Sequence, residues 1–180
     1  MLKKYGLVLG IGLAIAIMVS LFVLGNKGNP SHTGDTAALL GDKHPDLGQK
    51  HIKVGEQHEG YNSNPPSSGP HYEQPAPWST DITNIADEQF VHNAEHGGVV
   101  VTFKPSIGDD QVKALQAVLA KLPKSQQFNE VKVVITPREA NTAPISLVAW
   151  GYTYDLQTFD EAKILQFYND HLDKGPELVP

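Results

Sequence analysis

Cysteine is absent from the 180-residue sequence, and this absence excludes several kinds of site at once. A chain without cysteine has no disulfide bond, no lipid-modified cysteine, no thiolate metal ligand and no cysteine nucleophile. Methionine is nearly absent as well, since Met1 and Met18 are the only two and both lie in the apolar N-terminal part. Binding of copper(I) through thioether sulfur is therefore excluded in the rest of the chain. Any metal there must be held by nitrogen and oxygen.

Clusters of basic residues are also missing after the N-terminus. The formal net charge is −6 at pH 7 with histidine neutral, and Lys3 and Lys4 form the only notable basic group. Nucleic acids and anionic lipid headgroups are bound by clustered lysine and arginine. The composition therefore argues against both as partners of the part that follows the apolar run, and it does not identify a protein partner.

The apolar run at residues 5–25 is uncharged and is preceded by Lys3 and Lys4. It is long enough to cross a hydrocarbon core of about 30 Å as a helix. The positive flank favours a cytoplasmic N-terminus, which places the following residues outside the cytoplasm. A cleaved signal peptide ending near residues 23–25 is the alternative, but its apolar region would be shorter. We expect residues 1–25 to form an uncleaved, single-pass membrane anchor.

Two further regions follow this run. Residues 26–46 are rich in glycine, asparagine, proline, serine and threonine, a composition typical of a flexible linker. From Leu47 the content of apolar and aromatic residues rises, so residues 47–180 are expected to form one extracytoplasmic domain.

The domain alternates between strand-like and helix-like segments. Strands are expected where β-branched and aromatic residues gather, and helices where apolar residues recur every three or four positions. The expected strands cover residues 99–103, 131–135 and 145–152, and the expected helices cover residues 109–122 and 159–172. This order predicts an α+β fold with a small mixed sheet covered by two helices. The first two strands should be parallel neighbours joined by the first helix, and the last two antiparallel.

The densest chemistry lies in VHNAEHGG at residues 91–98. In a helix, His92 and His96 stand one turn apart on one face, which is the spacing of helical metal ligands. Glu95 lies on an adjoining face, and Glu88 lies one turn before His92. Histidines in the last turn of a helix can also serve only to stabilise the negative end of its dipole.

A proline-rich loop, YNSNPPSSGPHY at residues 61–72, precedes this helix and carries His71. Prolines restrict the backbone, so the loop can hold His71 in a fixed place. We therefore predict that His71, His92 and His96 converge on a zinc or copper(II) ion. Glu88 or Glu95 would be a fourth ligand or an acceptor that orients an imidazole, and His51 is a reserve ligand. The same loop could instead pack its aromatic residues on the body of the domain.

Other functions remain open. Residues 92–96 have the H-x-x-E-H form of inverted zinc peptidases, in which the glutamate activates water. That class needs a longer helix and a further ligand far downstream, whereas Gly97 ends this helix. The sequence therefore favours a metal-binding domain over a metallohydrolase. A domain that binds a partner without metal is the other alternative.

Several of these motifs together resemble the DUF3105 family, a set of proteins with a domain of unknown function. The resemblance extends over about residues 48–177. It rests on GQKHI at 48–52, the loop at 61–72, Glu88, VHNAEHGGVV at 91–100, AWG at 149–151 and GPE at 175–177. It implies a membrane-tethered extracytoplasmic domain whose polar centre includes His51, His71, His92, Glu95 and His96. It implies no particular activity.

Overall fold

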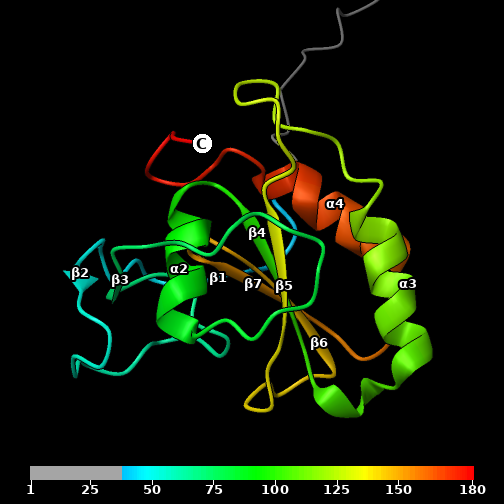
Figure 1. Cartoon of the computed structure of the whole chain (residues 1–180), viewed down its shortest axis with the longest axis horizontal. Helices are drawn as coiled ribbons and strands as arrows, with labels where there is room; N and C mark the ends of the chain where they lie inside the picture. Colours follow the sequence, from blue (N-terminus) through cyan, green and yellow to red (C-terminus); the bar gives the residue numbers. More distant parts are fainter. Residues whose placement is uncertain (1–37) are drawn as a thin grey trace, which may run out of the picture. The chain divides into compact units, whose positions relative to one another are not determined.

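The computed structural model describes residues 38–180. The expected membrane anchor and most of the expected linker therefore lie outside the described residues. Among residues 38–180, no helix is both long and apolar enough to cross a membrane. Residues 39–180 form one compact unit (Figure 1).

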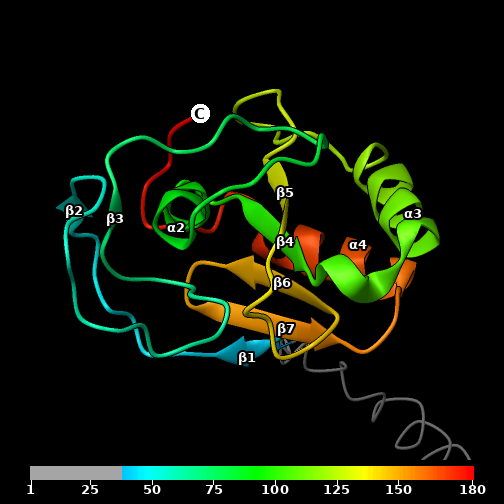
Figure 2. The same cartoon turned by 60° about the horizontal axis from the view of Figure 1, so that its bottom comes forward.

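A five-stranded mixed sheet forms the centre of this unit, with the strand order β1-β7-β6-β4-β5 (Figure 2). The strands are β1 (Asp42–Lys43), β4 (Val99–Phe103), β5 (Val133–Pro137), β6 (Ile145–Ala149) and β7 (Tyr152–Leu156). Strands β4 and β5 are parallel, and the other neighbouring pairs are antiparallel. The predicted α+β fold with a mixed sheet is confirmed.

The predicted parallel pair is also confirmed. Val99 of β4 lies opposite Val133 of β5, and helix α3 (Asp109–Leu119) connects the two strands after the short 3-10 helix η1 (Pro105–Ile107). The helix ends at Leu119, three residues earlier than expected, because the chain turns before Pro123. Proline cannot continue a helix. The helix therefore ends before Pro123, although apolar residues keep helical spacing as far as Leu122.

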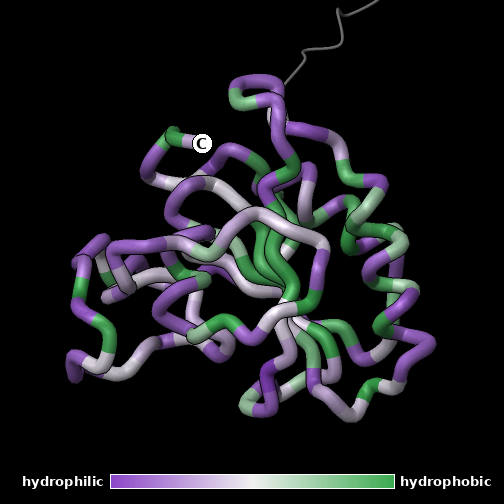
Figure 3. Tube along the Cα trace, in the orientation of Figure 1, coloured by the Kyte–Doolittle hydropathy of each residue, from purple (hydrophilic) through white to green (hydrophobic). Residues whose placement is uncertain are grey.

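Helices cover both faces of the sheet. Side chains alternate along a strand, so Val99, Val101 and Phe103 of β4 pack into one core while Val100 packs into another. Helices α3 and α4 (Glu161–His171) cover the first face, and α2 (Asp87–Glu95) covers the second (Figure 1). Hydrophobic residues are accordingly concentrated along the central strands (Figure 3). The two helices expected over the sheet share one face, and α2 completes a third layer.

The observed strands differ from the predicted ones in three respects. The segment expected as one strand at residues 145–152 is a hairpin of β6 and β7, with Trp150 and Gly151 at its turn. Gly151 has a φ of 70°, a conformation that favours glycine. Strands β5 and β6 run in opposite directions, but β4 lies between them. In addition, β1 lies inside the expected linker and pairs with β7.

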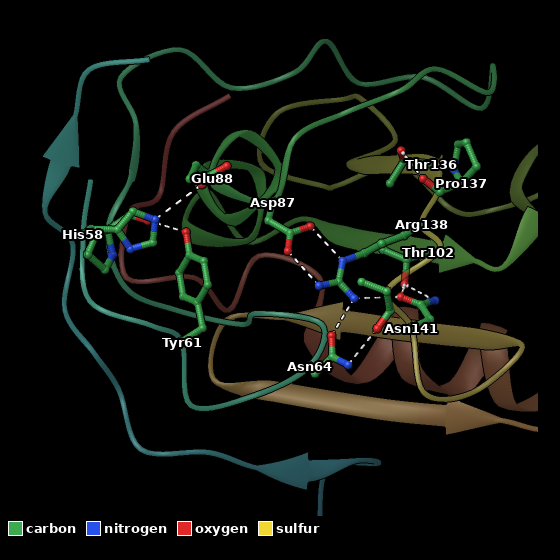
Figure 4. A network of polar contacts seen from close by, with 12 residues as sticks. His58, Tyr61, Asn64, Asp87, Glu88, Thr102, Thr136, Pro137, Arg138 and Asn141 are labelled. Atoms are coloured by element: carbon green, nitrogen blue, oxygen red, sulfur yellow. Dashed lines mark hydrogen bonds and ion pairs between the residues drawn. The ribbon is translucent and has the colours of Figure 1, made fainter. Parts of the chain in front are cut away.

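Arg138, which follows β5, connects the proline-rich loop to the start of α2 (Figure 4). Its Nε and Nη2 each donate a hydrogen bond of 2.7 Å to Asp87 in the first turn of α2. Its Nη1 donates to the Asn64 side chain of the loop at 2.6 Å. A forked, charge-assisted pair of this kind fixes geometry as well as adding stability. The loop that carries His71 and the helix that carries His92 are thereby held together.

His171, at the end of α4, should make the stability of the fold depend on pH. Its Nε2 donates to the Leu40 backbone oxygen at 2.8 Å, and its ring packs against Phe167. Burial lowers the pKa of His171 below 6.5, against smaller raising effects of the Leu40 hydrogen bond and Asp170 and a further small lowering by Lys174. Because the unfolded chain then binds the proton more readily, the free energy of unfolding should fall as pH drops below 6.5.

The measurement is urea unfolding of chelator-treated protein between pH 7.5 and pH 5. Each unit by which the folded pKa lies below the unfolded value is worth about 1.4 kcal/mol. The variant His171→Gln keeps a donor for Leu40 but does not titrate, so its stability should decline less over this range. A wild-type stability that is flat or rises toward pH 5 would contradict the prediction.

Candidate metal centre

Helix α2 places His92 and Glu95 three residues apart, so their side chains lie near each other, with Nε2 of His92 3.8 Å from Oε2 of Glu95. Phe90 and Val91 belong to the core between α2 and the sheet. The helix ends where Gly97 adopts a φ of 77°, as expected for the glycine past a helix end. All residues from Phe90 to Glu95 are buried, because other segments cover the helix on its remaining sides.

One of those segments is a small parallel sheet of β2 (His51–Ile52) and β3 (His71–Tyr72). It lies beyond α2 from the main sheet (Figures 1 and 2). In its register, His51 stands directly opposite His71, and the two ring centroids are 4.8 Å apart. The pairing therefore brings together two imidazoles from the two ends of the segment that contains the proline-rich loop.

Four side chains converge between this small sheet and α2. Oε2 of Glu95 lies 3.0 Å from Nε2 of His71, 3.7 Å from Nε2 of His51 and 3.8 Å from Nε2 of His92. The four possible ligand atoms all lie within 4.8 Å of one another. Two ligands on one tetrahedral zinc ion are about 3.3 Å apart, given metal–ligand bonds of about 2.0–2.1 Å. The group could therefore hold a metal ion after small movements.

Backbone oxygens determine which nitrogen of two imidazoles faces the cluster. Nδ1 of His71 lies 2.7 Å from the backbone oxygen of Gly69, and Nδ1 of His92 lies 2.6 Å from that of Tyr72. Since a carbonyl only accepts, each Nδ1 carries the hydrogen, and in a neutral ring Nε2 then presents a lone pair. Metal-binding histidines are oriented in the same manner.

Glu95 and His71 form the buried centre of the cluster. Glu95 is fully buried, and its Oε1 has no hydrogen-bond partner among residues 38–180. Burial lowers the pKa of His71, outweighing the hydrogen bond to Gly69 and the Glu95 carboxylate, which raise it. Nε2 of His71 and Oε2 of Glu95 are 3.0 Å apart, a distance that either a shared proton or a coordinated metal ion accounts for. A metal ion at this position would also engage His51 and His92.

The predicted site residues thus fall in three places. His71, His92 and Glu95 meet, and the third imidazole of the group is that of His51. His96 lies next to the group, with its Nε2 2.9 Å from Nε2 of His92. Burial lowers its pKa, with His92 lowering it further, against the raising effects of Glu177, Glu95 and Pro180.

Glu88 does not take part in the group. Its carboxylate lies 3.4 Å from Nε2 of His58, at the N-terminal end of α2 (Figure 4). In the H-x-x-E-H form of a zinc peptidase, the two histidines bind one ion and the glutamate contacts water. Here Glu95 is buried among imidazoles instead, and His96 belongs to a different group from His92.

Glu177 is a residue of this region to which the sequence assigned no role. Its backbone nitrogen donates to the Glu95 backbone oxygen at 3.1 Å, and its Oε2 lies 3.6 Å from Nε2 of His96. The buried Lys132 supports this arrangement by donating to the backbone oxygens of His96 and Val179 at 2.8 and 2.6 Å. The one feature of the sequence that points to Glu177 is the GPE motif at residues 175–177, which belongs to the family resemblance.

His51 connects the cluster to solvent. Its side chain is 45% exposed, whereas those of His71 and Glu95 are fully buried. A hollow of about 560 Å³ lies next to the flanking residues Lys50 and Pro70, and another of about 420 Å³ lies next to Ile52 and Tyr72. The exposed face of His51, on the β2–β3 side, is therefore where a small ion could approach the cluster.

Comparison with known proteins gives one family. The family described as "Protein of unknown function (DUF3105)" matches residues 51–179, a range that includes every member of the cluster. No curated protein and no solved structure matches the chain.

Proposed function

We propose, for a chain that belongs to the DUF3105 family, that the domain binds a divalent metal ion through His51, His71, His92 and Glu95. The observation that carries the proposal is the fully buried Glu95 carboxylate, which faces the Nε2 atoms of three histidines. An uncompensated buried charge is costly, and a dication coordinated by all four side chains would offset that cost.

The ligand set favours particular metals. Three imidazole nitrogens and one carboxylate oxygen suit zinc, which accepts both in tetrahedral sites. Copper(II) is the second choice, because it also binds imidazole and carboxylate. The bound ion would hold the β2–β3 pair against α2.

The proposal is tested by metal content after purification and reloading with zinc. The wild type should bind zinc tightly, while His71→Ala and His92→Ala should bind it at least about 10-fold more weakly, because loss of even a group that only hydrogen-bonds to a ligand costs about 10–100-fold. His44→Ala is the control, because His44 bonds to Thr153 and is outside the cluster. Equal zinc binding by all four proteins, or no binding by the wild type, would reject the proposal.

The location of the domain is a second part of the proposal. The uncharged run at residues 5–25, preceded by Lys3 and Lys4, supports a single membrane anchor with the domain outside the cytoplasm. Protease added to intact spheroplasts should then digest the domain. Protection until the cells are lysed would reject this topology.

A further inference from the structure

We infer that the cluster is one half of a two-metal centre, in which Glu95 bridges the first ion to a second ion held by His96 and Glu177. The inference rests on the proposed metal binding at the first position. It adds a distinct site with its own ligands, and these ligands come from the end of α2 and from the C-terminal segment.

The second group of ligands is independent of the first except for Glu95. Glu95, His96 and Glu177 offer ligand atoms that lie within 4.8 Å of one another. Oε2 of Glu95 faces the first group, and its buried Oε1 has no hydrogen-bond partner among the described residues. A buried carboxylate with one oxygen engaged and the other unpaired is suited to bridge two cations.

His92 and His96 turn the same ring nitrogen toward each other at hydrogen-bonding distance, a spacing that ligands of two neighbouring ions can also have. Nε2 of His92 and Nε2 of His96 are only 2.9 Å apart, and the two rings are nearly perpendicular at 84°. In two-metal sites the ions are about 3.5–4 Å apart, so neighbouring ligands on different ions can approach this closely. His92 would then serve the first ion and His96 the second.

The C-terminal segment is fixed firmly enough to supply a ligand. The Asp173 nitrogen donates to the Gly97 oxygen at 2.9 Å, and Glu177 is bonded to the end of α2 as described. Gly175 packs so closely that an added Cβ would collide with the Glu95 backbone oxygen. The segment accordingly passes beside α2 in both views (Figures 1 and 2).

The two positions should differ in affinity. Each position has one exposed ligand, His51 at 45% in the first and Glu177 at 44% in the second, but the other three ligands of the first are buried, whereas in the second only Glu95 is. Within residues 38–180, three side chains would hold the second ion, so water would complete its coordination. We therefore expect it to bind more weakly than the first and to be lost first on dialysis against a chelator.

Zinc titration of the metal-free full-length protein by calorimetry tests the inference. The wild type should bind two equivalents, the weaker of which disappears in Glu177→Gln and in His96→Ala. Glu139→Gln, a change at an exposed glutamate outside both groups, should still bind two. With two equivalents of copper(II), the wild type should show the half-field electron paramagnetic resonance signal of a coupled pair, and Glu177→Gln should not. Circular dichroism verifies that each variant is folded.

The outcomes separate the two proposals. One equivalent in the wild type, abolished by His71→Ala but unchanged by Glu177→Gln, would overturn the two-metal centre and leave the single site intact. Two equivalents in both Glu177→Gln and His96→Ala would also overturn it, because the second ion would then lie elsewhere. Absence of any binding would overturn both.

Discussion

Replacing Glu95 with glutamine should weaken zinc binding by about 100-fold or more, because loss of an outer hydrogen-bond partner alone already costs 10–100-fold in such sites. The amide has nearly the shape of the carboxylate but lacks its charge. In the metal-free protein the same change should be neutral or stabilising by about 1 kcal/mol, since a buried charge is removed and the amide can donate to His71. The two effects therefore have opposite signs.

Zinc calorimetry and urea unfolding in a chelator measure these two effects. If His71 and Glu95 were instead held together by a proton, as an ion pair without metal, Glu95→Gln would destabilise the metal-free protein and zinc would stabilise neither form. Glu139→Gln is the matched control at an exposed position, and both quantities should be unchanged in it.

Asn93→Ala should lower the free energy of unfolding by about 3 kcal/mol, because two buried backbone groups lose their partners. The Asn93 side chain accepts from the Ala76 nitrogen at 2.9 Å and donates to the Ala76 oxygen at 2.8 Å, and all these atoms are buried. The side chain thus pairs with Ala76 as a neighbouring strand would. The higher helix propensity of alanine offsets less than about 0.7 kcal/mol of this loss in the free energy of unfolding.

Urea unfolding of the metal-free protein measures this loss. Asn169→Ala provides the control, because Asn169 is an exposed asparagine in α4 and its replacement should change stability by less than about 0.5 kcal/mol. Equal stability of the two variants would show that the Asn93–Ala76 pairing contributes nothing.

Local sequence patterns were sufficient to predict the part of the fold in which elements that are consecutive in the sequence also pack against each other. The β-branched run of β4, the periodic α3 and the run leading into β5 form one parallel unit, as expected from their lengths. The turn between β6 and β7 was missed because Trp150 and Gly151 interrupt an apolar segment without a proline or an asparagine–glycine pair. Strand β1 was missed because two residues carry no recognisable period.

The same holds for the site: contacts within one helix could be predicted from the sequence, and contacts between distant segments could not. Helical spacing correctly indicated that His92 and His96 would be close, and their Nε2 atoms are 2.9 Å apart. It could not indicate that the loop approaches α2 on the side of Glu95. The contribution of His51 depends on the β2–β3 register, and that of Glu177 depends on the path of the C-terminal segment. Neither follows from periodicity.

The register that places His51 opposite His71 has a consequence for the unfolded chain. A metal bound to both residues, and to His92, would close two successive loops of 20 and 21 residues, from 51 to 71 and from 71 to 92. Cross-linking a loop of about 15 residues removes chain entropy worth about 3 kcal/mol. In a protein without cysteine, the ion would thus act as a reversible substitute for disulfide bonds, one that a chelator or acid can open without any change in redox state.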